Sequence, residues 1–312
     1  MDLKRMHAAV AAYAEGADER DVARLRFFER VLELQQRRAD ELAARHAGDG
    51  APCELPEGTD VAGLYRRQEP VFSQAPVAID PAELAETLAA VAGCIADGAG
   101  LSPQASAGLR AVDWGALAAG LDMRQAGSDP AGFIDDVLMR ADGLGVSTQV
   151  PLGVLASVLQ LSLRPHLQPA AEWVARQCRQ DRETPPASAS LDCPVCGAPA
   201  SASWVGESAG TDGRGRVQYC ATCGTQWGFE RIRCTNCGTR NEGHLHYHSV
   251  AGDPAHRIQT CDECGGYSRV VFREDLEKGP FVMEVEDVVM ANLDQIANDP
   301  RLREQLLDSK RV

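Results

Sequence analysis

The sequence lacks any apolar run long enough to cross a membrane. The longest candidate, residues 150–163, is interrupted by Gly153, Ser157, Gln160 and Ser162, whereas a transmembrane helix needs about 20 mostly apolar residues. The first residues, MDLKRMHAAV, also lack the pattern of a signal peptide. We therefore expect a cytoplasmic protein that does not bind membranes.

Motifs of catalysis and phosphate binding are missing as well. The sequence contains no glycine-rich phosphate loop, no nucleophile elbow and no metalloprotease helix motif. His7, His46 and His166 are isolated in the sequence, so we interpret each as a surface or capping residue and not as a ligand. The expected protein is accordingly not an enzyme.

Positive charge is scarce. The formal net charge is −14, and residues 189–273 contain no lysine, while eight arginines there balance eight acidic residues. Four thiolates around a divalent ion would add a charge of about −2 per site. Binding to nucleic acid or to an anionic membrane needs a cationic surface, because affinity comes from neutralised phosphates. We therefore expect no nucleic-acid partner.

Paired cysteines are abundant. Eight of the eleven cysteines lie in four Cys-x-x-Cys-Gly units, and a shift of 41 positions places the first two units on the last two. The flanking residues follow the same shift, since 216–218 (RVQ) correspond to 257–259 (RIQ). Such regularity predicts a tandem repeat of one small metal-binding unit.

A Cys-x-x-Cys turn brings two thiolates to one tetrahedral metal ion, and the glycine after it suits a left-handed backbone. Two turns joined by a hairpin complete a four-sulfur site. We predict a first site of Cys193, Cys196, Cys220 and Cys223, and a second site of Cys234, Cys237, Cys261 and Cys264. Nested pairing of the four units is the alternative. Disulfides or a thioredoxin-like motif fit less well with this repeated spacing and context.

The first 184 residues are predicted to form an all-helical domain. Apolar residues recur at helical spacing between residues 18 and 46. Three helix starts are indicated by a capping residue before a proline, at Asp80, Ser102 and Asp129. Pro151 should begin a further helix that ends before Pro165, and Pro169 should begin another.

The remaining chain divides into four segments. Residues 185–192 are interpreted as a linker, residues 193–230 and 231–273 as two metal-binding ribbons, and residues 274–312 as an acidic helical segment in which Asp287 caps the helix. The predicted fold is therefore a helical N-terminal domain, tandem rubredoxin-like or zinc-ribbon-like modules with small β-structure, and a C-terminal helix. This helix should return to the helical domain or its junction with the ribbons, where a cleft would suit a partner.

Three histidines alternate along an expected strand of the second ribbon. His244, His246 and His248 would share one face of that strand. A third metal site and a solvent-facing strand are the two interpretations, and we favour the second.

Aromatic residues of the ribbons could stack on bases or cover the cysteine turns. The charge balance favours cover, since a neutral-to-acidic ribbon is poorly suited to phosphates. The residues concerned are Tyr219, Trp227, Phe229 and Tyr247.

One segment carries a resemblance to a known family. The run Tyr219-Cys220-x2-Cys223-x3-Trp227-x3-Arg231-x2-Cys234-x2-Cys237, placed after a helical domain and before a fourth Cys-x-x-Cys-Gly, resembles the formate dehydrogenase accessory protein family, FdhE. The resemblance implies a cytoplasmic maturation factor that binds the catalytic subunit of respiratory formate dehydrogenases. These are molybdenum–selenium or related enzymes, exported by the twin-arginine pathway after cofactor insertion. It also implies rubredoxin-like iron sites.

We therefore expect two metal ions, each bound by four thiolates, and two metals are candidates. Tetrahedral cysteine spacing suits zinc and iron alike; ribbon modules by themselves favour structural zinc, whereas the resemblance favours iron. A rubredoxin-like electron carrier and, less favoured, a zinc-ribbon nucleic-acid binder are the alternative functions. Trp227 and Arg231, between the two sites, are candidates for partner contact, and self-association is left open.

Overall fold

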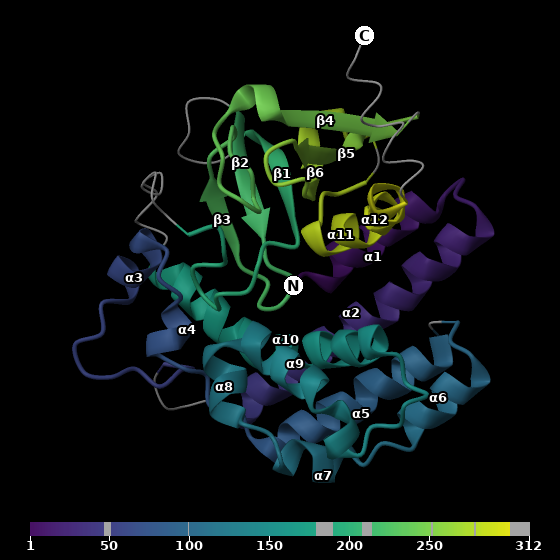
Figure 1. The fold of residues 1–312 in the computed structure, drawn as a ribbon, viewed down its shortest axis with the longest axis vertical. Coiled ribbons are helices and arrows are strands. Elements are labelled where there is room, and N and C mark those ends of the chain that lie inside the picture. Colours follow the sequence, from purple (N-terminus) through teal and green to yellow (C-terminus); the bar gives the residue numbers. More distant parts are fainter. Residues whose placement is uncertain are drawn as a thin grey trace.

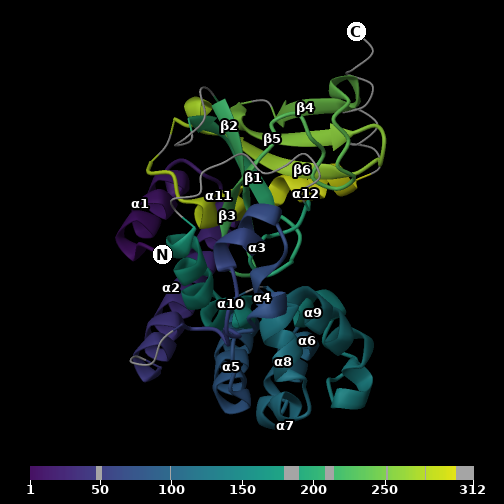
Figure 2. The ribbon, with the colours of Figure 1, turned by 90° about the vertical axis from the view of Figure 1, so that its left-hand side faces the viewer.

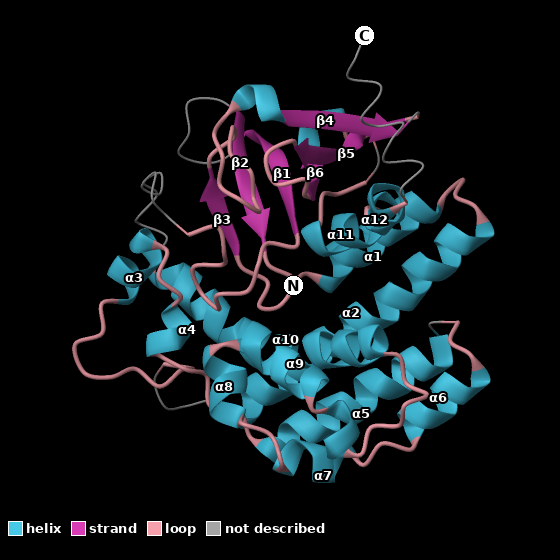
Figure 3. Cartoon of the chain, in the orientation of Figure 1, coloured by secondary structure: helices cyan, strands magenta, loops and turns pink. Residues whose placement is uncertain are grey.

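The structure is a computed structural model, and it describes residues 1–46, 51–98, 100–178, 190–207, 214–250, 252–277 and 279–299. A helical half lies beneath a small β-sheet, and two short C-terminal helices lie between the sheet and the first helices (Figure 1). Figure 2 shows the same stacking from the side, and Figure 3 shows that helices and strands occupy separate parts of the molecule. The predicted fold class is confirmed.

The described elements before the sheet are all helical. They are α1 (Leu3–Ala14), α2 (Glu19–Arg45), α3 (Val61–Arg67), α4 (Val71–Gln74), α5 (Pro81–Gly98), α6 (Pro103–Arg110), α7 (Trp114–Ala119), α8 (Met123–Ser128), α9 (Pro130–Met139), the 3₁₀ turn Ala141–Leu144 and α10 (Leu152–Gln177). Asp80, Ser102 and Asp129 each accept a hydrogen bond from a backbone N–H two or three residues further on. The three predicted helix starts, of α5, α6 and α9, are therefore correct.

The prediction that helix α10 would break at proline is wrong. The helix runs through Pro165 and Pro169 without interruption. Pro165 has no N–H to donate to the carbonyl of Leu161 one turn earlier, but the side chain of Gln35 on α2 donates to that carbonyl instead, at 2.8 Å. A neighbouring helix thus supplies the missing hydrogen bond.

A single apolar core joins the helices to the first cysteine turns. Helix α10 packs against α2 and α5, and the buried cluster at this contact continues into Cys193, Val195, Cys196, Cys220 and Cys223. The first four-cysteine group is therefore part of the core of the helical half.

The two ribbons form one six-stranded sheet with the order β3-β2-β1-β6-β5-β4. The strands are β1 (Ala202–Glu207), β2 (Arg214–Tyr219), β3 (Gln226–Phe229), β4 (Leu245–Val250), β5 (Asp253–Cys261) and β6 (Tyr267–Phe272), with 3₁₀ turns at Glu242–His244 and Arg273–Asp275. Each repeat contributes three antiparallel strands, and parallel pairing of β1 with β6 joins the repeats. The repeats therefore follow one another across the sheet in the same direction.

The C-terminal segment returns to the junction of the two halves, as predicted. Helices α11 (Met283–Val289) and α12 (Ala291–Asn298) cover one face of the sheet, and α11 also packs against α1 and α2. The expected cap at Asp287 is wrong, because Asp287 lies inside α11, where its carboxylate accepts a hydrogen bond from Arg269 at 2.7 Å.

Most of the predicted linker 185–192 and residues 300–312 of the predicted C-terminal segment lie outside the described residues. The domain boundaries proposed from the sequence therefore stay predictions. Within the described part of the chain, no helix combines the length and apolar character needed to cross a bilayer.

Candidate metal centres

The four Cys-x-x-Cys-Gly units share one backbone geometry. In each unit the first cysteine N–H donates to the carbonyl five residues ahead, and the glycine N–H donates back to the first cysteine carbonyl, at 2.8–3.1 Å. The glycines have φ between 67° and 80°, a left-handed conformation that a residue with a Cβ rarely adopts. Local sequence alone therefore shapes the four turns.

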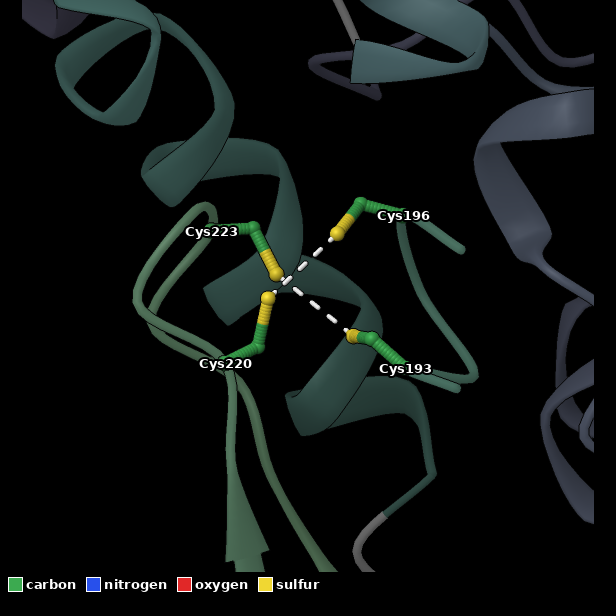
Figure 4. A group of neighbouring side chains, drawn as sticks. All are labelled: Cys193, Cys196, Cys220 and Cys223. Carbon is green, nitrogen blue, oxygen red and sulfur yellow. Dashed lines mark hydrogen bonds between the residues drawn. The ribbon is translucent and has the colours of Figure 1, made fainter. Parts of the chain in front are cut away.

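The structure brings the eight cysteines together in the two predicted sets. Each set places its four sulfurs within 4.8 Å of one another. In the first set, the sulfurs of Cys193 and Cys223 are 3.7 Å apart and those of Cys196 and Cys220 are 3.5 Å apart, all pointing to a common centre (Figure 4). In the second set, Cys234–Cys264 and Cys237–Cys261 are each 3.8 Å apart.

These separations fit a tetrahedral metal ion. Metal–sulfur bonds of about 2.3 Å place the sulfurs of a tetrahedron about 3.8 Å apart. A disulfide would need a separation of about 2.0 Å, so the geometry contradicts the disulfide alternative. The sets also follow the sequential pairing and not the nested one. Each could hold one metal ion, and the donor set of four sulfurs suits zinc and iron alike.

The first group is sealed by the helical half. The backbone N–H groups of Val71 and Phe72, at the start of α4, donate to the carbonyls of Pro194 and Val195 at 3.0 and 2.8 Å. Burial raises the pKa of the Cys193 thiol, and it raises the pKa of Tyr65 nearby. Four buried thiolates can persist here only beside a cation, because an isolated buried charge costs far too much free energy.

Arg164 of α10 ties the helices to the first group. Its side chain is buried, donates to the hydroxyl of Tyr219 and to the carbonyl of Ala221 (3.4 Å), and forms an ion pair with Glu284 of α11 at 2.6 Å. Ala221 lies between two cysteines of the group. Arg164 therefore fixes a cysteine turn, the sheet and α11 relative to α10.

Arg216 takes a comparable position beside the second group. It is fully buried, and the acceptors that the described residues offer its guanidinium are all uncharged: Ser203, Gln259, Ser268 and the carbonyl of Arg233. Arg233 directly precedes Cys234. Four thiolates and a divalent ion carry a charge of about −2, so the second site would place a negative charge close to this arginine.

The histidines of β4 and of the 3₁₀ turn before it lie beside the second cysteine group but do not form a third metal-binding group with it among the described residues. His244 lies 3.5 Å from Glu263 and His246 lies 2.9 Å from Asp262, both within the turn between Cys261 and Cys264. Among the described residues, the two cysteine sets are the groups with metal-binding geometry. The structure therefore favours the non-ligand interpretation of these histidines.

The aromatic side chains of the ribbons mainly pack inside the protein and do not form an exposed stacking surface. Tyr219, Trp227 and Phe229 are buried, whereas Tyr247 is partly exposed and packs edge-on against Phe272. Trp227 is thus unsuited to contact a partner. Arg231 is exposed.

A charged cluster around the buried side chain of His256, between β5 and α11, was not predicted. His256 forms ion pairs of 2.8 Å with both Asp253 and Glu286, and the Tyr13 hydroxyl donates to Glu286 at 2.7 Å. The three elements involved are far apart in the sequence, so periodicity and spacing contain no signal for this contact. His166 also differs from expectation, because it is buried and hydrogen-bonded to Thr87 at 3.1 Å.

A cavity of about 860 Å³ lies at the junction of the two halves. Its walls come from α2, α5, α10, α11 and both ribbons, and they combine apolar residues such as Phe28, Val154 and Leu161 with the Arg164–Glu284 and Arg269–Asp287 pairs. The predicted cleft between the halves is therefore present.

Comparisons with known proteins agree with the sequence motif. The model of the family described as "FdhE, central domain" matches residues 192–231. The Protein FdhE homolog of Aquifex aeolicus (strain VF5) is 29% identical over 155 residues, which cover 49% of this chain and 52% of the relative. Protein FdhE of Escherichia coli O1:K1 / APEC is 33% identical over 114 residues, which cover 36% of this chain and 33% of the relative.

The chain thus spans about half or less of the length of these curated relatives. A solved structure matches more extensively: the crystal structure of the FdhE protein from Pseudomonas aeruginosa aligns with 97% of this chain and 90% of that one, with a TM-score of 0.50 and 19% identity. This match shows a shared fold. Together the comparisons bear out the resemblance that the cysteine motif indicated.

Proposed function

Because the family model, the curated relatives and the shared fold all support the FdhE family as the family of this chain, we propose that the protein is an accessory factor in the formation of formate dehydrogenase. We further propose that it acts by binding the catalytic subunit of that enzyme in the cytoplasm, and not by catalysis. The observation that carries the proposal is the FdhE central-domain match, which covers the whole first cysteine group.

The cavity at the junction of the halves is the surface we assign to the catalytic subunit. An apolar segment of the client would bury its side chains against Phe28, Val154 and Leu161. Apolar burial of this kind contributes about 25 cal/mol per Å². The Arg164–Glu284 and Arg269–Asp287 ion pairs line the cavity and join its walls. The two metal-binding groups then serve to hold the sheet wall of the cavity in place.

A cavity-filling variant tests this assignment. Gly153 lines the cavity, and a Cβ added there meets no atom within 4 Å, so Gly153→Trp should fill the cavity without disturbing α10. Gly143→Trp is the control, because Gly143 has equal space and does not line the cavity. We expect purified catalytic subunit to bind the wild type and the control, and to bind Gly153→Trp at least about tenfold more weakly. Equal binding by both variants contradicts the assignment, and no binding by the wild type contradicts the function.

A rubredoxin-type electron carrier is the second candidate, and the exposure of Cys237 and Cys264 favours it. Iron bound by four thiolates would supply one-electron chemistry, and an exposed sulfur face would shorten the path to a redox partner. The test is the visible spectrum of protein purified without oxidants, before and after reduction. A colourless protein that contains only zinc removes this candidate.

A further inference from the structure

The two cysteine groups have the same backbone geometry but differ strongly in the solvent exposure of their cysteines. In the first group all four cysteines are buried, and Cys196 and Cys223 are each only 1% exposed. Their counterparts 41 positions later, Cys237 and Cys264, are both exposed. One repeat unit is thus found in two environments.

The helical half causes this difference. The backbone N–H groups of helix α4 donate to carbonyls of the first cysteine turn. The side chain of Pro70 packs against Gly197, and the side chain of Arg164 packs against Gly224. Parallel pairing of β1 with β6 places the second repeat on the far side of the first. The second group therefore has no helix over its outer sulfurs among the described elements.

The residues inside the turns show the same contrast. The first group has Pro194 and Val195 in one turn, both buried, and the second group has Thr235 and Asn236 at these positions. Asn236 is exposed and its backbone N–H lies 3.4 Å from the sulfur of Cys234. In this turn, the covered group thus has apolar residues where the open group has polar ones.

Within the cysteine turns, carboxylates occur in the open group and not in the covered one. Asp262 and Glu263 lie between Cys261 and Cys264 and are exposed, whereas Ala221 and Thr222 occupy these positions in the first group. A carboxylate beside an exposed thiolate raises the local concentration of divalent cations. The open face therefore offers both access and attraction to a metal ion.

We propose that the second group is an exchangeable site for a thiolate-binding divalent ion, which enters and leaves through the face of Cys237 and Cys264, while the first group, within the core, releases its ion far more slowly. In the exchange, donor atoms of an external chelator replace the thiolates one after another. The ion keeps its charge, no electrons are transferred, and the freed thiolates take up protons from water. The inference goes beyond the accessory function and holds for zinc and for ferrous iron.

The test uses the full chain reconstituted with two zinc ions. Excess EDTA is added together with N-ethylmaleimide, and the labelled cysteines are mapped over time by mass spectrometry while zinc release is followed. We expect one zinc to leave first, with alkylation of the second group at least about tenfold faster than that of the first, because buried sites react only after local unfolding. Cys53 and Cys178, buried outside both groups, report how burial alone slows the reagent.

Matched variants separate the two sites. Cys264→Ser should remove the fast zinc ion and leave a folded protein with one slowly released zinc. Its counterpart Cys223→Ser should destabilise the helical half as well, since Cys223 belongs to that core. If either variant fails to fold, the labelling order in the wild-type protein still decides. Equal labelling rates, faster labelling of the first group, or a second group that takes up no zinc overturns the proposal.

Discussion

Arg216 of the first repeat donates a hydrogen bond of 2.8 Å to Gln259 of the second repeat, although two strands of the sheet lie between them. The guanidinium crosses the junction of the repeats and also bonds Ser203 on β1 and Ser268 on β6. Since neighbouring residues on a strand face opposite sides, this face of the sheet is the one opposite α11 and α12, against which Val217 and Tyr219 pack.

Replacing Arg216 should therefore weaken the contact between the two repeats and destabilise the protein. Arg216→Met leaves several buried acceptors without a donor, and we expect the free energy of unfolding to fall by about 3 kcal/mol. Arg257, the counterpart of Arg216 in the second repeat, is only partly buried and pairs with Asp275 at 2.6 Å, so Arg257→Met should cost less than about 1 kcal/mol. Denaturant unfolding of the zinc-loaded variants measures both values, and equal losses would contradict this role of Arg216.

Arg164 should control the contact between the helical half and the first cysteine group. Arg164→Gln leaves Glu284 as a largely buried carboxylate without its ion pair, at a cost of about 3 to 5 kcal/mol. Lysine has no fork of donors, so Arg164→Lys should recover only part of the loss. Hydrogen exchange should accelerate at residues 220–224 in both variants. Arg110→Gln, which removes an exposed pair with Asp97, is the control and should change neither quantity.

The features that could be predicted from sequence are those that local chemistry determines. The four cysteine turns require a fixed spacing and a glycine, and the caps at Asp80, Ser102 and Asp129 need only a side-chain oxygen near a free N–H. Both kinds of feature are complete within about five residues of chain, so reading the sequence was enough to find them.

The features that were missed depend on contacts between distant residues. Pro165 looked like a helix end because the donor that replaces its N–H, Gln35, lies on another helix. The cluster of His256, Asp253 and Glu286 likewise forms only when α11 returns to the sheet. The sequence did contain a signal for the different solvent exposure of the two cysteine groups. Apolar Pro194 and Val195 in the first group correspond to polar Thr235 and Asn236 in the second.

The bond from Gln35 to the Leu161 carbonyl can be tested by a double-mutant cycle. Gln35→Leu leaves this carbonyl without a donor and should lower the free energy of unfolding by about 1.5 kcal/mol. In a Pro165→Ala background, the restored N–H of residue 165 can bond Leu161, so the same substitution should cost almost nothing. Arg37→Leu, at an exposed position of α2, is the control. An equal cost of Gln35→Leu in both backgrounds would contradict the explanation.

The buried His256 should make stability fall at alkaline pH. Burial by itself lowers the pKa of His256, but hydrogen bonds to Asp253 and Glu286 outweigh it and raise the pKa to about 9. The groups that face His256 are these two carboxylates and the ring of Tyr13, 6.0 Å away. The folded protein therefore holds the proton more tightly than an unfolded chain, in which histidine has a pKa of about 6.5.

A group with a raised folded pKa stabilises the protein fully below its unfolded pKa, and this stabilisation is lost as the pH rises through the folded pKa. The contribution of His256 should be complete near pH 6 and should decline between about pH 6.5 and 9, by at most about 3 kcal/mol for the shift involved. Cysteine thiols titrate over the same interval, so the measured quantity is the difference in unfolding free energy between the wild type and His256→Gln. His46→Gln, at an exposed histidine, is the control. A difference that stays constant from pH 6 to pH 9.5 would show that folding does not raise the pKa of His256, and it would contradict a stabilising role of its ion pairs with Asp253 and Glu286.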